Sequence, residues 1–111
     1  MITFKSAQRI LRKLPRENAF YFFTSIGNYT GVSADSMEEF AKKLLEVNTK
    51  SLEFHLYRGD FQKWVEGTLE DKALSDEIRK LQLSKPLGNE LRDNLYLTVS
   101  KHYEKLKKSS F

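Results

Sequence analysis

The sequence predicts a mainly α-helical fold, a compact single domain (residues 1–111) of about five helices with a short β-hairpin near residues 19–33. Three observations lead to this expectation. Apolar residues recur at helical spacing over most of the chain. Residues that favour helix starts precede several of these segments. One stretch breaks the pattern with a cluster of aromatic residues typical of strands. A chain of 111 residues is also long enough to bury a core without disulfides or metal.

The N-terminal segment predicts a short amphipathic helix. Phe4, Ala7, Ile10 and Leu14 recur at helical spacing, and basic residues lie on the opposite face. Pro15 lacks a backbone donor and restricts the residue before it, so we expect this helix to end by Leu14.

The segment 19–33 is the least helical part of the chain. The run from Phe20 to Thr24 is rich in aromatic residues, which favour strands, and Gly27-Asn28 is suited to a tight turn. These features predict a hairpin. The alternative interpretation is a first helix that continues through the aromatic run and breaks at Gly27, because periodicity alone does not separate the two.

Capping signals predict the remaining helices. Ser36 followed by Glu39 matches the capping box, and an apolar stripe follows it. Asp60 and Asp71 are each predicted to cap a further helix. Pro86 suits the first turn of a long basic helix over about residues 86–108, in which His102 lies on the apolar stripe and is expected to pack.

Composition limits the functional classes. The chain has no cysteine, and no apolar run is long enough to cross a membrane, so we expect a cytoplasmic protein without membrane attachment. Only two histidines are present and neither has a neighbouring ligand at metal-binding spacing, so we expect no metal and no cofactor. Nucleotide-binding fingerprints and nucleophile elbows are absent from the sequence.

The net charge of +4 is distributed unevenly along the chain. Residues 1–16 carry five basic and no acidic side chains, and residues 84–111 carry six basic and three acidic ones. The middle, residues 17–83, carries eight basic and twelve acidic side chains. Basic ends of this kind suit an anionic partner, or they pack near the acidic middle and neutralise it.

The most informative stretch runs from Ser51 to Trp64 and reads Ser-Leu-Glu-Phe-His-Leu-Tyr-Arg-Gly-Asp-Phe-Gln-Lys-Trp. Its apolar residues fit a helix that ends at Gly59 in a left-handed cap, with the next helix starting at an angle.

This run, together with Phe20-Tyr21-Phe22-Phe23-Thr24 upstream, resembles a small archaeal and bacterial domain family of unknown function over about residues 7–80. The resemblance implies a compact domain that occurs alone or attached to larger enzymes, and it implies no particular activity. Two departures stand out: Glu70-Asp71 replaces the family's usual Gly-Asp, and the basic C-terminal helix lies outside the resemblance.

Four residues of this stretch are candidates for a binding site: His55, Arg58, Asp60 and Trp64. His55 and Arg58, at helical spacing beside a helix start, could bind a phosphate or carboxylate, and His55 could act as a general acid or base. The structural interpretation is favoured: Asp60 caps a helix, Arg58 pairs with an acid such as Glu53, and His55 fills the core edge.

The favoured functional hypothesis is a non-enzymatic binding module that docks a partner protein through Arg58 and the corner between Tyr57 and Trp64. The first alternative is nucleic-acid binding by the basic N- and C-terminal helices, through Arg9, Arg12, Lys101 and Lys105. The second alternative is an enzyme or an anion site around His55 and Arg58. Oligomeric state does not follow from the sequence.

Overall fold

The computed structural model describes residues 3–110. Six α-helices, one 3₁₀ turn and one two-stranded hairpin make up this part of the chain. In order they are α1 (Phe4–Ile10), η1 (Arg16–Asn18), β1 (Phe20–Ser25), β2 (Asn28–Ala34), α2 (Met37–Leu44), α3 (Thr49–Arg58), α4 (Asp60–Gly67), α5 (Lys72–Leu83) and α6 (Gly88–Ser109). The mainly α prediction is therefore confirmed.

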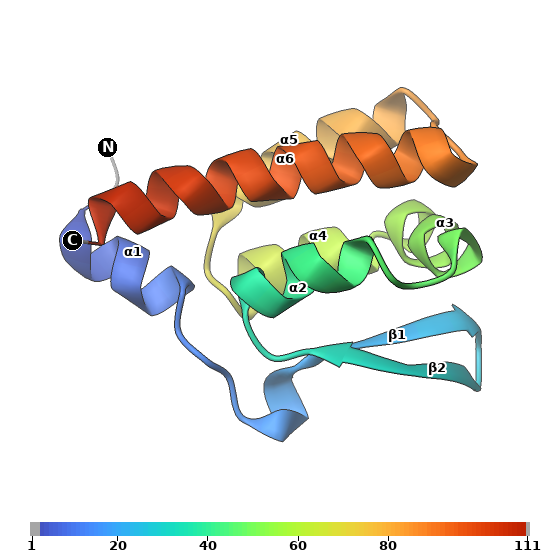
Figure 1. Ribbon diagram of the computed structural model, residues 1–111, viewed down its shortest axis with the longest axis horizontal. Coiled ribbons are helices and arrows are strands. Elements are labelled where there is room, and N and C mark those ends of the chain that lie inside the picture. The colour runs from blue at the N-terminus through green and yellow to red at the C-terminus, as the bar shows by residue number, and fades with distance from the viewer. Residues whose placement is uncertain (1–2, 111) are drawn as a thin grey trace.

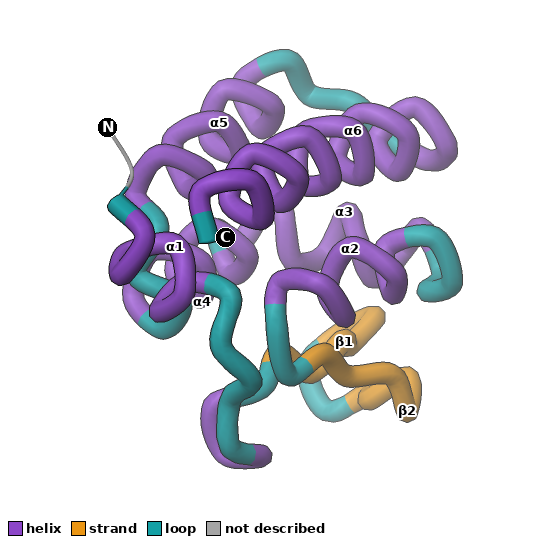
Figure 2. Tube along the Cα trace, turned by 60° about the vertical axis from the view of Figure 1, so that its left-hand side comes forward, coloured by secondary structure: helices purple, strands orange, loops and turns teal. Residues whose placement is uncertain are grey.

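The elements form three layers, visible in Figure 1. Helices α5 and α6 lie side by side in one outer layer, α2, α3 and α4 form the middle, and the hairpin covers the opposite side. The tube view in Figure 2 shows the same order, with α1 beside the C-terminal end of α6. The radius of gyration, 13.2 Å, is that of a compact chain of this length.

The hairpin prediction for residues 19–33 is confirmed, and the alternative of one continuous helix is wrong. β1 and β2 pair antiparallel around Gly27, whose φ of 79° suits the tight turn. Phe20 and Phe22 point into the core, while Tyr21 between them is exposed. This period-two pattern gives the aromatic run one buried face, which a strand provides and a helix does not.

Two of the predicted caps are present and one is wrong. The Ser36 hydroxyl accepts a hydrogen bond from the Glu39 N–H, and the Asp71 carboxylate accepts one from the Leu74 N–H. Asp60 does not cap α4, because Gly59 occupies the N-cap position without a side-chain bond. The Asp60 carboxylate turns instead toward a side chain of the preceding helix.

Helix α6 lies across α2, α3 and α5 and seals the core. Its buried face carries Leu91, Leu95, Val99 and Leu106 at helical spacing. The helix begins at Gly88, so Pro86 lies before its first turn rather than within it. Tyr57 donates a hydrogen bond to the Pro86 carbonyl, which ties the entry to α6 onto α3. Within residues 3–110, no helix is both long enough and apolar enough to cross a membrane.

Candidate functional site

The corner between α3 and α4 positions the predicted site residues. Gly59 adopts a left-handed conformation (φ 79°) that ends α3 and turns the chain directly into α4. The turn brings His55, on the last turn of α3, within hydrogen-bond distance of Asp60, the first residue of α4. Nδ1 of His55 lies 2.8 Å from Oδ2 of Asp60.

Both ring nitrogens of His55 are bonded. Nε2 accepts a hydrogen bond of 2.8 Å from the backbone N–H of Phe23 in β1. Because Nε2 supplies a lone pair there, the proton of the neutral ring sits on Nδ1 and is donated to Asp60. The ring is 4% exposed and packs edge-on against Phe20. Burial lowers the pKa of His55 below its ordinary value, and the hydrogen bond with Asp60 only partly opposes that effect.

This bonding decides what His55 can do chemically. A general base needs a free lone pair within reach of the proton it removes. The Nε2 lone pair of His55 is occupied by a strand N–H, and its Nδ1 proton is held by a carboxylate. The arrangement therefore serves to join β1 to the α3–α4 corner, and it agrees with the structural interpretation of His55 as a residue at the core edge.

The sequence suggested that Arg58 pairs with Glu53, and the structure does not contain this pair. Its guanidinium lies over the Phe54 ring, 4.6 Å from the centroid, and its Nε lies 3.4 Å from Oδ2 of Asp60. Glu53 accepts a hydrogen bond from the Gly88 N–H instead. The Arg58 side chain is 48% exposed. Its terminal nitrogens form no hydrogen bond with any residue between 3 and 110, so they can still donate to an outside group, and its one ion pair within these residues is with Asp60.

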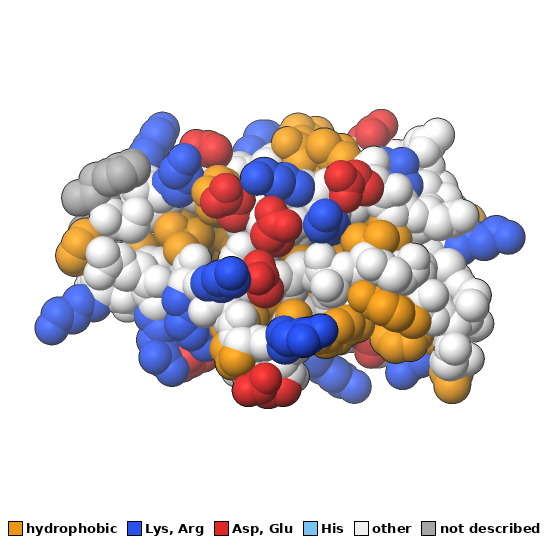
Figure 3. Space-filling model, turned by 60° about the horizontal axis from the view of Figure 1, so that its bottom comes forward, with side chains coloured by type: hydrophobic (Ala, Val, Ile, Leu, Met, Phe, Trp, Pro, Cys, Tyr) orange, Lys and Arg blue, Asp and Glu red, His pale blue; other side chains and the backbone are white. Residues whose placement is uncertain are grey.

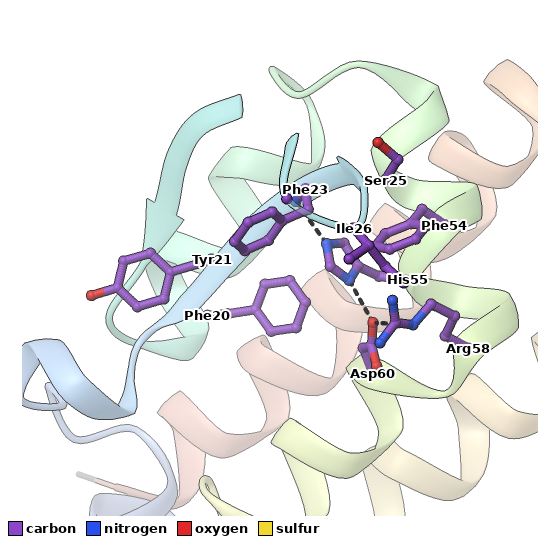
Figure 4. A pocket seen from close by; sticks show the side chains of 10 residues that line it. Phe20, Tyr21, Phe23, Ser25, Ile26, Phe54, His55, Arg58 and Asp60 are labelled. Atoms are coloured by element: carbon purple, nitrogen blue, oxygen red, sulfur yellow. Dashed lines mark hydrogen bonds and ion pairs between the residues drawn. The ribbon is translucent and has the colours of Figure 1, made fainter. Parts of the chain in front are cut away.

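An open pocket of about 350 Å³ lies beside this corner, and we call it the hairpin pocket. Figure 4 shows its side chains, with dashed lines that join His55 to the Phe23 backbone and to Asp60, and Asp60 to Arg58. Ile26, at the hairpin turn, is 86% exposed at the mouth. The pocket is lined by Phe20, Tyr21, Phe23, Ser25, Ile26, Gly27, Phe54, His55, Arg58 and Asp60.

Trp64 lies apart from the pocket lining, although it was predicted with the same group. Its ring packs against Phe20 and Phe40, and its indole N–H donates to the Asn18 carbonyl at 2.8 Å. The residue is buried. Its hydrogen bond satisfies the only polar atom of a large buried ring, which identifies Trp64 as a packing residue.

The predicted basic surface divides into two unlike halves. Arg9 forms a 2.6 Å ion pair with Glu70, and Arg12 donates to the Thr68 carbonyl at 2.8 Å. Lys101 and Lys105 lie on α6, and within the described part of the chain neither forms an ion pair. On the face shown in Figure 3, basic and acidic side chains are intermixed rather than gathered by sign.

His102 is not a simple packing residue. Its Nε2 lies 2.6 Å from Oδ2 of Asp71, which is 3% exposed. No local sequence pattern predicts this pair, because the two residues are 31 positions apart. A histidine on an otherwise apolar stripe was the only indication. Nowhere in residues 3–110 do three His, Asp or Glu side chains lie where they could share a metal ion.

Residues 15–110 match the family described as "Family of unknown function (DUF5752)". The match includes α6, which the resemblance from sequence had left out, and it begins after α1. No curated protein and no solved structure matches the chain. Since the match covers most of its length, the chain belongs to the DUF5752 family, a family of unknown function.

Proposed function

We propose that this chain is a non-enzymatic binding module that docks a partner protein at the hairpin pocket. The observation that carries the proposal is an open apolar pocket whose one histidine is fully occupied by internal hydrogen bonds. Such a pocket offers burial of an apolar group, and its histidine has no free lone pair with which to act as a base.

The exposure of the pocket mouth supports docking. Large apolar side chains left in water at a concave site are typical of protein contacts, where an anchor side chain from the partner fills the hollow. Ile26 is mostly exposed, and two other residues of the hairpin, Tyr21 of the pocket lining and Tyr29, are also exposed. A partner that covered the turn would remove this apolar surface from water.

Charge at the rim indicates the chemistry of the partner. Arg58 lies over Phe54 with Nε toward Asp60, and its terminal nitrogens, which make no hydrogen bond within residues 3–110, lie at the edge of the pocket. A guanidinium fork binds a carboxylate through two parallel hydrogen bonds. The partner segment should therefore place an apolar side chain in the pocket and an Asp or Glu against Arg58. The absence of cysteine leads us to place this contact in the cytoplasm.

A displayed library of random peptides, selected against the full chain, tests the proposal. We expect enriched peptides to share an apolar residue with a nearby acidic one. Their binding should be lost with Ile26→Glu and weakened about tenfold with Arg58→Gln, the loss expected for a charge-assisted pair. Leu45→Glu is the matched control, because Leu45 is also exposed but does not line the pocket.

Three results would overturn the proposal. One is the absence of any enriched consensus. Another is a consensus whose binding survives Ile26→Glu. The third is an equal loss with Leu45→Glu, which would show that any added surface charge has the effect. Sedimentation of the free chain supplies a further check, since self-association abolished by Ile26→Glu would mean that a second copy, not a separate partner, covers the pocket.

A further inference from the structure

A second candidate site lies on the opposite layer of the molecule, where Asp71 meets His102. Asp71 ends the link between α4 and α5. Its Oδ1 accepts the Leu74 N–H at 3.0 Å, and its Oδ2 accepts from Nε2 of His102 at 2.6 Å. The carboxylate is thus fully bonded and fixes the orientation of the His102 ring.

The free nitrogen of His102 distinguishes it from His55. Nδ1 of His102 forms no hydrogen bond with the residues from 3 to 110. Among these residues, fully buried side-chain polar atoms without a partner occur only in Ser51, Gln62 and Arg92. Nδ1 of His102 is therefore accessible to solvent, and the ring lines a groove.

This groove, of about 610 Å³, runs between α5 and α6. Lys101 and Lys105, one helical turn apart, line it together with His102. Each of these lysines lacks an ion-pair partner in the described structure. The acid on the facing wall is Glu77, which is paired with Lys80 at 3.2 Å. The groove therefore holds two unpaired cations and one histidine nitrogen against a single acid that already has a partner.

We propose that the groove between α5 and α6 binds a small oxyanion, a phosphate monoester or a carboxylate, through His102, Lys101 and Lys105. Nδ1 of His102, when protonated, donates to the anion while Nε2 remains on Asp71. The ammonium groups of Lys101 and Lys105 then contribute charge-assisted bonds from the same face of α6. Asp71 is a positioning residue, because it acts on the anion only through the His102 ring.

This site is separate from the hairpin pocket and shares no lining residue with it. Neither proposal depends on the other, and each has its own variants. Of the four residues of the predicted basic surface, Lys101 and Lys105 on α6 would bind the anion in this groove, which is a more specific role than membership of a general basic surface. Arg9 and Arg12 are excluded from that role because Glu70 and the Thr68 carbonyl already bind them.

Titration with inorganic phosphate, followed by amide and imidazole NMR shifts of the full chain, tests the inference. Acetate is the carboxylate probe, and chloride at equal ionic strength is the control for screening. We expect saturable shifts at His102, Lys101, Lys105 and Ala73 with phosphate or with acetate, and the tighter of the two probes assigns the ligand class. Chloride should give small shifts that do not saturate.

Four variants sharpen the test. Lys101→Gln with Lys105→Gln should weaken the response about tenfold. His102→Gln retains a donor to Asp71 but lacks Nδ1, so it should weaken binding to a similar degree. Glu77→Gln removes the facing acid and should tighten binding several-fold. Lys50→Gln with Lys63→Gln removes the same charge from exposed positions outside the groove and should leave binding unchanged.

The inference is overturned if phosphate and acetate shift the spectrum no more than chloride does. It is also overturned if the Lys101 and Lys105 pair can be replaced without effect, or if the Lys50 and Lys63 pair causes the same loss. The lysine variants carry the decision even if His102→Gln fails to fold, because both lysines are exposed and make no internal ion pair in the described chain.

Discussion

The Nε2 atom of His55 accepts the backbone N–H of Phe23 at 2.8 Å, so one helix side chain holds the hairpin against the corner between α3 and α4. Asp60 completes the arrangement by accepting the Nδ1 proton. The pair of bonds makes His55 a tertiary junction between elements 32 residues apart in the sequence. Several measurable consequences depend on it.

Replacing His55 should destabilise the fold far more than replacing Arg58. His55→Asn removes the buried acceptor of the Phe23 N–H and the histidine partner of Asp60, which should cost about 2–4 kcal/mol of unfolding free energy. Arg58→Gln removes only a half-exposed pair and should have a much smaller effect. Urea denaturation of both variants measures the difference. Equal losses would contradict the distinction between the two roles.

Stability should decrease as the pH falls below the ordinary histidine range. The pKa of His55 is lowered in the folded chain, mainly by burial, so the unfolded chain binds the proton more readily. The loss begins as the pH falls through the unfolded value, about 6.5, and grows until the lower folded pKa is reached. Denaturation between pH 7 and 5 measures it. The slope should be smaller in His55→Asn, and an identical slope would count against His55 as its source.

The left-handed turn at Gly59 should resist replacement by alanine. Its φ of 79° disfavours any β-carbon, although no atom lies within 4 Å of where that carbon would be. Gly59→Ala should therefore cost about 1–2 kcal/mol through the backbone alone, and Gly59→Asn less. Gly67 is the internal control, because it lies in the last turn of α4 and has open space around it. Gly67→Ala should be neutral or stabilising by about 0.5 kcal/mol. Thermal unfolding of the three variants distinguishes these effects.

The neighbouring acids Glu70 and Asp71 should differ sharply in their importance. Asp71→Ala removes both a helix cap and the partner of His102, with an expected cost of about 2 kcal/mol. Glu70→Ala removes an exposed pair with Arg9 and should change stability little. Chemical denaturation gives the comparison. A larger loss for Glu70→Ala would mean that the link from α4 to α5 is held by its surface ion pair.

Features encoded by neighbouring residues were predictable from the sequence. The alternation in the run that begins at Phe20, the cap at Ser36 and the left-handed turn at Gly59 each depend on local backbone chemistry, and the structure has all three. The prediction that Asp60 caps α4 was wrong because a carboxylate beside a helix start can accept either from a backbone N–H of that helix or from a nearby side chain. His55, five residues earlier in the chain, provides the competing partner, and a capping signal alone does not decide between the two.

The parts of the candidate sites that sequence could not supply are long-range pairings. His55 with Phe23 and His102 with Asp71 each join residues about 30 positions apart, and one sequence contains no signal for that separation. The two histidines also show why residue type alone is a weak guide to chemistry. One has both nitrogens bonded, the other has one nitrogen unbonded within residues 3–110, and nothing near either in the sequence indicates which is which.

The bond from Phe23 to His55 also bears on how the protein behaves at high concentration. A two-stranded sheet presents backbone donors that can recruit a strand from another molecule, which is a common route to aggregation. The imidazole accepts one of these donors from β1 and so occupies a position that a foreign strand would otherwise fill. In this fold the His55 side chain of α3 accepts the Phe23 N–H that a third strand would otherwise accept.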